Sequence, residues 1–498
     1  MQLAELLQAL PDAGEVGEVN VPVTGLTYDS RLVQPGWLFV AIRGTHVDGH
    51  AYIADAWARG AVAVVGQEAP TIAPAGVRYI RTADSRRALA LLACRFYDYP
   101  ARRLGVIGVT GTDGKTTTTN LISAILDAAG QSNGLISTVN FKVGAVSWDN
   151  ITRQSTPESL EVQQMLAEML AAGARYAVIE TTSHALVLDR VVGCEYDVAV
   201  ITNITHEHLD FHGSLDSYRH AKARLFAMLD PENHKSPPVP KAAVLNADDS
   251  SYTFLRPFCR VPIVSYGIDQ PADIRADRLA LSGAGSAFRV RFPDGEIFVE
   301  TRLVGRFNVA NCLAAMAVAY VLGIAPDAMR RALASIAGIP GRMEPIDCGQ
   351  PFSVVVDYAH TPDSLEKVLQ TLRSLTPGRL IAVFGSAGER DVQKRPLMGA
   401  VAARYADFFV ITDEDPREED RQAILEAIAA GADSVGSVRG RDYLCIADRR
   451  AAIAAAFTQA RPGDTVLLAG KGHEQCIIMG RERVPWDDRR VARELLTQ

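Results

Sequence analysis

The chain has 498 residues, which at roughly 150 residues per domain predicts about three domains. Its formal net charge of −7 argues against a general nucleic-acid or acidic-membrane binder, because those surfaces attract basic proteins. Seven cysteines without a Cys-x-x-Cys pair are typical of a reducing compartment, not of a disulfide framework or zinc knuckle. The sequence starts without a basic leader and has no run approaching the roughly 20 apolar residues that span a bilayer, so we expect a cytoplasmic protein without membrane insertion.

Residues 1–100 alternate apolar runs of strand length with helical segments. Residues 37–42 and 61–65 are predicted as buried strands, and residues 52–59 as a helix. This alternation indicates a small α/β domain. The polar segments 29–31 and 43–50 lie where α/β domains bind ligands, although an ordinary surface turn is the simpler interpretation of each one alone.

A glycine-rich turn follows between a predicted strand, residues 106–109, and a predicted helix, residues 121–126. This order builds a phosphate-binding loop, because backbone N–H groups and the helix dipole both face the anion. Lys115 can reach the outer phosphates, and the Thr116 hydroxyl can bind Mg²⁺. The alternative is a glycine turn that only caps a helix, and Val109 departs from the common P-loop, which has Gly there.

Charged residues follow two further predicted strands. Residues 176–179 lead into Glu180, and residues 198–203 lead into three histidines and two carboxylates at positions 206–212. A carboxylate at a strand end beside a P-loop strand is where NTP-binding folds hold Mg²⁺. Without the P-loop, Glu180 would be a solvated strand end. Zinc is the alternative ligand of the histidine cluster, but the cluster lacks His-Glu-x-x-His spacing and a cysteine partner.

Several other polar segments have simple structural explanations. Residues 155–159 could cap a helix, with Pro157 and Glu158 in its first turn. A lone lysine such as Lys222, on the helical segment 218–226, normally faces solvent. Asn308 or Asn311 could cap an Ala-rich helix at residues 312–322. Residues 270–300, with an Asp-Gly turn, predict an inserted or appended hairpin.

The last third of the chain contains four apolar runs that each end in a charged loop. The runs are residues 354–356, 380–385, 408–412 and 465–469. This is the pattern of an open, mostly parallel sheet that binds ligands at its carboxyl edge.

Together these segments resemble the MurE-type Mur ligases, the UDP-N-acetylmuramoyl-tripeptide synthetases. The motifs that carry the resemblance are T-G-T-x-G-K-T, S-T-P-E-S, E-T-T-S-H, T-x-E-H-L-D, A-K-x-R-L-F, F-N-V-A-N, G-R-M-E, D-Y-A-H-T-P, D-P-R and G-K-G-H-E, spread over nearly the whole chain. The resemblance implies an α/β protein with the three-domain Mur ligase architecture. It places a UDP-sugar-binding domain at residues 1–100, a P-loop ATPase domain with a parallel sheet at residues 101–340 and a Rossmann-like ligase domain at residues 341–498.

The resemblance also implies a reaction. ATP phosphorylates the D-Glu carboxylate of UDP-N-acetylmuramoyl-L-alanyl-D-glutamate, and the amine of a diamino acid displaces phosphate from the acyl phosphate. This step belongs to peptidoglycan biosynthesis, and hence to cell wall biogenesis, cell shape and cell division. ATP, Mg²⁺ and a monomeric enzyme are expected. A ligase like folylpolyglutamate or cyanophycin synthetase, which need not have D-P-R and G-K-G-H-E, and a P-loop NTPase without ligase activity are the alternatives.

Roles for single residues follow from matching the family's motifs. The catalytic residues are Lys115, Glu180, His208 and Lys222. The Mg²⁺ ligands are Thr116, Glu180, His208 and Lys222, the last as a carbamate formed with CO₂. The ATP-binding residues are Gly111, Thr112, Asp113, Gly114, Lys115, Thr116, Thr117, Asn308, Asn311, Arg342, Asp357 and His360. The UDP-sugar-binding residues are Ser30, Ser155, Thr156, Thr182 and Arg190. The amino-acid-binding residues are Arg390, Asp413, Asp415, Pro416, Arg417, Gly470 and Glu474.

The incoming amino acid is where the sequence departs from its family. The usual motif for meso-diaminopimelate is D-N-P-R, and here Asp415 replaces the Asn. Arg417 favours a distal carboxylate, because guanidinium binds carboxylates bidentately. An acidic site formed by Asp415 and Glu414 would suit a distal ammonium, as in L-lysine or L-ornithine. Glu474 could also hold such an ammonium. The residues favour meso-diaminopimelate slightly. Leu188 is a second departure, at a position where some relatives have a polar substrate contact.

Overall fold

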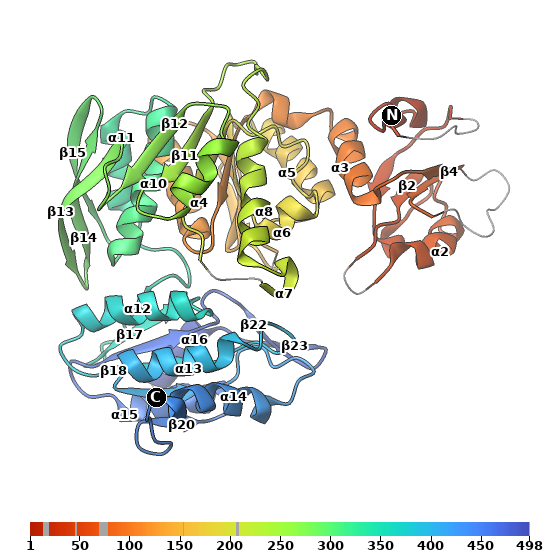
Figure 1. The fold of residues 1–498 in the computed structure, drawn as a ribbon. Coiled ribbons are helices and arrows are strands. Elements are labelled where there is room, and N and C mark those ends of the chain that lie inside the picture. Colours follow the sequence, from red (N-terminus) through yellow and green to blue (C-terminus); the bar gives the residue numbers. More distant parts are fainter. Residues whose placement is uncertain (13–18, 45–46, 69–77, 153, 206–208, 498) are drawn as a thin grey trace.

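The computed structural model describes residues 1–12, 19–44, 47–68, 78–152, 154–205 and 209–497. Within these ranges the strands form three large sheets, one in each successive part of the chain, and one small hairpin (Figure 1). No helix in them is long and apolar enough to cross a membrane.

The first sheet has four parallel strands in sequence order. They are β1 (Gly25–Thr27), β2 (Trp37–Val40), β3 (Ala63–Gly66) and β4 (Arg78–Arg81). Helices α1 (Leu3–Leu7) and α3 (Ser85–Phe96) pack on one side, and α2 (Ile53–Ala58) packs on the other, because each presents an apolar face to the strands. The strands and the helix predicted here lie within two residues of these bounds.

The central sheet has eleven strands in the order β15-β14-β13-β12-β11-β10-β5-β9-β6-β7-β8. Its parallel centre consists of β5 (Gly105–Thr110), β6 (Asn133–Ile136), β9 (Tyr176–Glu180), β10 (Val198–Ile201), β11 (Ala242–Asn246) and β12 (Ile263–Gly267). Antiparallel strands β7 (Asn140–Val143) and β8 (Val146–Asp149) extend one edge.

Helices cover both faces of the central sheet. Alternate residues of β5 point to opposite faces, so Ile107 packs with α4 (Lys115–Ala128), α10 (Arg306–Val321) and α11 (Pro326–Ser335). Val106 packs on the other face, with α5 (Ser159–Ala171) and α8 (Leu215–Ala227). Shorter helices are α6 (Ser183–Val187), α7 (Leu209–His212) and α9 (Ser251–Leu255). The apolar run of β5 is therefore buried on both sides, as a central parallel strand must be.

The hairpin expected at residues 270–300 is present but larger than expected. Three antiparallel strands, β13 (Ile274–Ser282), β14 (Gly285–Phe292) and β15 (Gly295–Thr301), continue the edge of the central sheet beyond β12. The segment is therefore part of the main sheet and not a separate appendage.

The third sheet has the order β16-β17-β21-β18-β19-β20. Its strands are β16 (Glu344–Ile346), β17 (Ser353–Asp357), β18 (Leu380–Phe384), β19 (Phe408–Ile411), β20 (Tyr443–Cys445) and β21 (Thr465–Ala469), and all but β16 are parallel. Helices α12 (Pro362–Leu375), α13 (Lys394–Tyr405) and α14 (Arg421–Ser434) cover one face, and α15 (Arg449–Gln459) and α16 (Asp488–Leu496) cover the other. The hairpin β22 (Cys476–Met479) and β23 (Glu482–Pro485) follows β21.

The four charged loops predicted to end strands meet at one edge of this sheet. Strands β17, β21, β18 and β19 are consecutive neighbours and parallel, so their carboxyl ends lie side by side. Figure 1 shows α12 on the side of this unit that faces the central sheet. The loops after β17 and β21 are thereby brought towards the P-loop.

Candidate active site

The P-loop connects β5 to α4 and depends on two glycines. Gly111 has φ +147° and Gly114, the residue before the helix, has φ +82°. A Cβ on Gly111 would lie 1.8 Å from Thr202 Oγ1, and one on Gly114 would lie 2.3 Å from Asn311 Oδ1. Glycine is required at both positions because both the backbone conformation and the space exclude a side chain.

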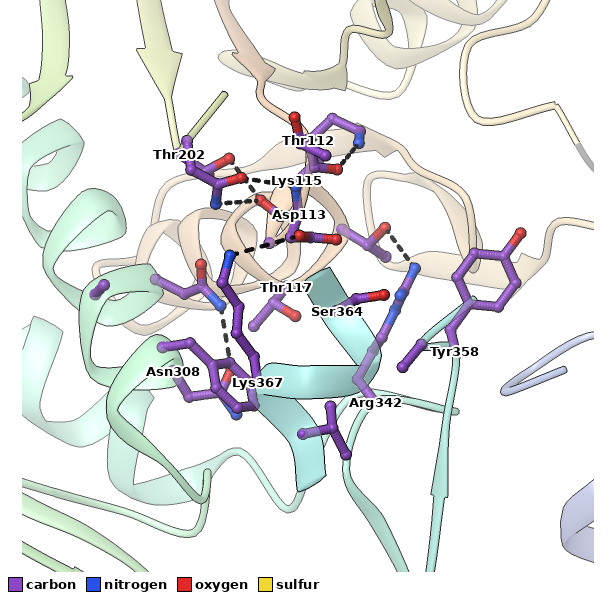
Figure 2. Close-up of a pocket in the computed structure, with 18 of the residues that line it drawn as sticks. Thr112, Asp113, Lys115, Thr117, Thr202, Asn308, Arg342, Tyr358, Ser364 and Lys367 are labelled. Atoms are coloured by element: carbon purple, nitrogen blue, oxygen red, sulfur yellow. Dashed lines mark hydrogen bonds and ion pairs between the residues drawn. The ribbon is translucent and has the colours of Figure 1, made fainter. Parts of the chain in front are cut away.

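Hydrogen bonds hold the loop in this shape. The Asp113 N–H donates to Asn203 Oδ1 at 3.0 Å, and Thr202 Oγ1 donates to Asp113 O at 2.6 Å. Lys115 Nζ donates to Thr112 O at 2.7 Å, so its amine lies over the loop (Figure 2). A turn that only capped a helix would not need a lysine folded back onto it. The arrangement is that of a phosphate-binding loop.

Glu180 is a buried carboxylate beside this loop. It ends β9, which pairs directly with β5, and is 1% exposed. Its Oε2 accepts hydrogen bonds from Thr116 Oγ1 at 3.0 Å and from the Thr138 N–H at 2.9 Å. A solvated strand end is thus excluded for Glu180. Its carboxylate and the Thr116 hydroxyl are adjacent hard oxygen ligands, which suit Mg²⁺.

Lys222 is also buried at the loop. It lies on α8 with 1% exposure, and its Nζ donates to Gly111 O at 2.6 Å and lies 4.4 Å from the centre of the Tyr218 ring. Tyr218 in turn is hydrogen-bonded to Thr112 Oγ1 at 3.1 Å. The interpretation of Lys222 as a solvated helix residue is wrong.

His208 lies outside the described residues, as do its neighbours His206 and Glu207. Within the described part of the chain, no group of three or more His, Cys, Asp or Glu side chains could hold a metal ion.

The C-terminal part of the chain adds residues to the same site. Arg342 Nη2 donates to Thr116 Oγ1 at 3.3 Å, and its guanidinium lies 4.5 Å from the centre of the Tyr358 ring. Asp357 ends β17 and accepts from the Met343 and Ala359 N–H groups at 2.7 and 2.8 Å. Burial raises the pKa of the Asp357 carboxyl above its ordinary value.

Asn308 and Asn311 project from the start of α10. The Asn311 amide donates to Asn308 Oδ1 at 3.1 Å, and Thr118 Oγ1 donates to Asn311 Oδ1 at 3.4 Å. The helix begins at Arg306 with Gly305 as its N-cap residue. Neither asparagine is therefore the N-cap residue of this helix; Asn311 contacts the P-loop helix, and Asn308 donates to Val304 O at 2.9 Å.

These residues surround one cavity of about 420 Å³ between the central and C-terminal parts (Figure 2). The expected ATP-binding residues from Thr112 to Thr117, together with Asn308, Asn311, Arg342, Asp357 and His360, line it. Gly111 lies immediately before the lining segment. Sequence reasoning missed Tyr358 and Lys367, which line it too. The available signal for Lys367 was its spacing four residues after Asp363, on the helix that follows D-Y-A-H-T-P.

Four of the five expected UDP-sugar-binding residues lie at this cavity or bond to residues beside it, whereas Ser30 lies elsewhere. Ser155 and Thr182 line the same cavity, and Thr156 Oγ1 donates to Glu180 O at 2.6 Å. Arg190 Nη1 donates to Thr156 O at 3.2 Å. Ser30 begins the 3-10 turn η1 (Ser30–Leu32) after β1 and is not among the described residues that line this cavity.

The segment 155–159 differs in detail from its prediction. Helix α5 begins at Ser159 and Glu158 is its N-cap residue, so Pro157 and Glu158 precede the helix and do not form its first turn. The Glu158 carboxylate instead accepts from Arg86 Nη1 at 3.0 Å and lies 3.4 Å from Arg190 Nε. It therefore connects the N-terminal part to the central part.

Asp415 and Glu474 meet around a buried cation. Lys471, with 0% side-chain exposure, donates from Nζ to Asp415 Oδ1 at 2.8 Å and is also paired with Glu474 Oε2. Asp415 Oδ1 accepts a second bond from the Ile478 N–H at 2.9 Å. Asp415 is thus paired with a cation of the protein itself, and Lys471 divides its single positive charge between two carboxylates.

The other expected amino-acid-binding residues lie in the neighbouring loops. Arg421 Nε donates to Asp413 Oδ2 at 2.8 Å, whereas Arg390 is exposed. Pro416 is buried, and Arg417, at φ +55°, is held by backbone bonds to Ile478 and Gly480. Gly470, at φ +104°, follows β21. In the same loop, burial and the charge of Arg342 lower the pKa of His473 to about 3, so its imidazole is neutral.

A P-loop with a buried carboxylate beside it, and a C-terminal unit that closes the same cavity, define a nucleotide-using α/β enzyme. Three family descriptions match the chain. They are "Mur ligase family, catalytic domain" at residues 22–97, "Mur ligase middle domain" at residues 109–319 and "Mur ligase, glutamate ligase domain" at residues 341–472.

Curated relatives match over the full length. A UDP-N-acetylmuramyl-tripeptide synthetase of Roseiflexus sp. (strain RS-1) is 50% identical, covering 100% of this chain and 99% of that protein. A UDP-N-acetylmuramoyl-L-alanyl-D-glutamate–2,6-diaminopimelate ligase of Geobacillus kaustophilus (strain HTA426) is 44% identical, covering 99% of each.

Solved structures agree. That of a UDP-N-acetylmuramoyl-L-alanyl-D-glutamate–2,6-diaminopimelate ligase has a TM-score of 0.68 and 31% identity, covering 100% of this chain and 99% of the other. MurF from Thermotoga maritima in complex with ADP, at 20% identity over 95% of this chain and 96% of the other, shares the fold with a TM-score of 0.63. The chain belongs to the Mur ligase family and resembles its MurE-type members most in these matches. The family and fold class expected from the motifs are confirmed.

Proposed function

We propose that this protein is the ATP-dependent ligase that joins meso-diaminopimelate to UDP-N-acetylmuramoyl-L-alanyl-D-glutamate in peptidoglycan biosynthesis. The observation that carries the proposal is the single cavity in which the P-loop, Glu180 and Arg342 from the C-terminal part converge. Full-length relatives named as 2,6-diaminopimelate ligases support the choice of substrate. L-lysine and L-ornithine are the alternative amino acids.

The residues account for the two chemical steps. In the first, the D-Glu carboxylate takes the terminal phosphoryl group of ATP and ADP departs. In the second, the neutral amine of the amino acid attacks the acyl carbon, phosphate leaves and the amine loses its proton. Lys115 and Arg342 would screen the repulsion between carboxylate and polyphosphate. Closure of the C-terminal part over the cavity would keep water from the acyl phosphate.

The buried oxygens of Thr116 and Glu180 fit Mg²⁺, and we assign them as its ligands together with His208 and Lys222 as its carbamate. When bound, Mg²⁺ supplies positive charge at the transferring phosphoryl group. Lys222 can form the carbamate only through its neutral amine.

The remaining assignments belong to this proposal. Ser30, Ser155, Thr156, Thr182 and Arg190 would bind the UDP-sugar substrate, and Arg417 would bind the distal carboxylate of the amino acid. The domain boundaries would lie near residues 100 and 340. A cytoplasmic monomer is consistent with the use of ATP and a UDP-sugar.

The test is phosphate release with ATP, Mg²⁺ and UDP-N-acetylmuramoyl-L-alanyl-D-glutamate, assayed with meso-diaminopimelate, L-lysine and L-ornithine separately. Release that requires meso-diaminopimelate supports the proposal, whereas release with another amino acid overturns its substrate. Release that persists without the UDP-sugar indicates a different P-loop enzyme.

Lys115→Ala should lower the rate of phosphate release at least about 100-fold, because it removes the charge nearest the phosphates. Full activity of this variant in the same assay would contradict the P-loop assignment.

A further inference from the structure

Lys367 connects the C-terminal part to the P-loop. It lies on α12, and its Nζ is 3.8 Å from Asp113 Oδ2 in the phosphate-binding loop. The same amine is paired with Asp363, four residues earlier on the helix. Figure 2 shows the Lys367 side chain extending from its helix towards Asp113, across the cavity they both line.

The charges explain why this contact matters. Asp113 places a carboxylate in a loop whose ligand is a polyanion, and like charges at close range repel. Burial tends to lower the pKa of Lys367, but the charges of Asp113, Asp363 and Asp249 outweigh it and raise the pKa. Lys367 is therefore a cation, and it offsets part of the negative charge on this side of the cavity.

The Lys367–Asp113 pair also depends on how the C-terminal part is placed against the central part. Asp113 belongs to the central sheet and Lys367 to the C-terminal one, so they meet only when α12 lies against the P-loop. A lysine that only paired with Asp363 would be an ordinary surface ion pair within a helix, with no effect on nucleotide.

We propose that Lys367 is a positioning residue for ATP, which neutralises Asp113 and makes tight nucleotide binding depend on docking of the C-terminal domain. It deepens the proposed function, since the nucleotide is the ATP of that reaction. The contact itself is independent of which amino acid is added.

The experiment measures binding of a non-hydrolysable ATP analogue with Mg²⁺ by calorimetry, together with the KM values for ATP and amino acid. Lys367→Met should weaken analogue binding and raise the KM for ATP about three- to tenfold, with a smaller change in kcat and in the KM for the amino acid. Asp113→Asn/Lys367→Met should bind within about twofold of Asp113→Asn alone, because the P-loop carboxylate that Lys367 neutralises is already absent. Arg373→Met is the matched control, since Arg373 lies on the same helix but pairs with Asp407.

Two results would overturn the inference. One is a Lys367→Met protein that binds the analogue as tightly as Arg373→Met, and the other is a loss that stays undiminished when Asp113 is also replaced. If the wild type binds the analogue but releases no phosphate with any amino acid, the proposed function fails, whereas the comparison of variants still decides the role of Lys367.

Discussion

The meaning of a charged residue in this protein depends on its burial. Lys222 lies on a helix whose sequence allows a solvated side chain, yet its amine is enclosed against the backbone of the P-loop. A buried lysine whose amine lies between the P-loop backbone and the Tyr218 ring would be an unusual choice for simple structural support. This burial supports the proposal that Lys222 reacts with CO₂ and that its carbamate would help to hold Mg²⁺.

Lys222→Ala should therefore lower amino-acid-dependent phosphate release at least about 100-fold, because the carbamate and its charge are lost. Short carboxylates such as acetate or formate should restore part of the activity by occupying the vacated space. Arg224→Met, on the same helix but exposed and paired with Asp189, should stay near the wild type. Wild-type activity of Lys222→Ala without additives would exclude the carbamate.

Asp415 shows the opposite case, in which a residue suspected of binding substrate is engaged internally. Lys471 Nζ and the Ile478 N–H both donate to Asp415 Oδ1, and an asparagine can offer an oxygen in the same place. Asp415→Asn should thus keep its preferred amino acid and lose less than about 2 kcal/mol of stability, because Lys471 retains Glu474.

Lys471→Met is the contrasting variant for this prediction. It leaves the buried Asp415 and the partly exposed Glu474 without that cation and should cost about 3 to 5 kcal/mol. Phosphate release with each of the three amino acids measures substrate preference, and urea unfolding measures the loss of stability. A change of preferred amino acid in Asp415→Asn would mean that this carboxylate contacts the substrate.

At the scale of elements, a buried ion pair holds the ends of two strands. Arg449, at the start of α15, forms a bidentate pair with Asp488 of α16, and both side chains are 0% exposed. The same guanidinium donates to Asp413 O at 3.1 Å and to Ala469 O at 2.8 Å, just where β19 and β21 end. The two loops proposed to bind the amino acid are thereby fixed relative to each other.

Arg449→Met should lower the free energy of unfolding by about 3 to 5 kcal/mol, because it leaves Asp488 buried without its partner. Arg449→Met/Asp488→Leu should recover a large part of this loss. Arg450→Met removes the neighbouring arginine, which pairs with Glu494 at the surface, and should cost less than about 1 kcal/mol. Urea unfolding followed by circular dichroism compares the three, and equal midpoints for the two single variants would contradict the prediction.

At the scale of the whole molecule, polar contacts connect the three sheets. Tyr28 donates to Glu161 at 3.0 Å between the N-terminal and central parts, and Gln475 donates to Asp149 at 3.0 Å between the central and C-terminal parts. For parts joined by contacts of this polar kind, relative motion is the default expectation. Burial, followed by the charge and hydrogen bond of Glu161, raises the pKa of Tyr28 well above its ordinary value.

Nucleotide bound between the parts should stabilise the whole chain. An ATP analogue with Mg²⁺ at about 100 times its Kd should add about 2.7 kcal/mol, because it binds only the folded protein. Thermal unfolding should show a higher Tm for the wild type and little change for Lys115→Ala. An equal rise in both would mean that the analogue binds elsewhere.

Local patterns were sufficient to predict much of this protein. The P-loop glycines, the apolar runs and the charged loops after strands depend on neighbouring residues, so backbone conformation and strand ends can be inferred from the chain alone. This is why Glu180 and Asp357 were expected at strand ends and why the family motifs could be recognised. The same reasoning placed four loops of the C-terminal sheet at one edge.

Contacts between distant segments were decided only by the tertiary structure. Burial of Lys222, the pairing of Asp415 with Lys471, the approach of Lys367 to Asp113 and the continuation of the central sheet by three antiparallel strands all join elements whose separation in sequence carries no signal. The amino-acid type gives the formal charge of a side chain. Whether water, a substrate or another side chain balances that charge depends on which groups the fold packs around it.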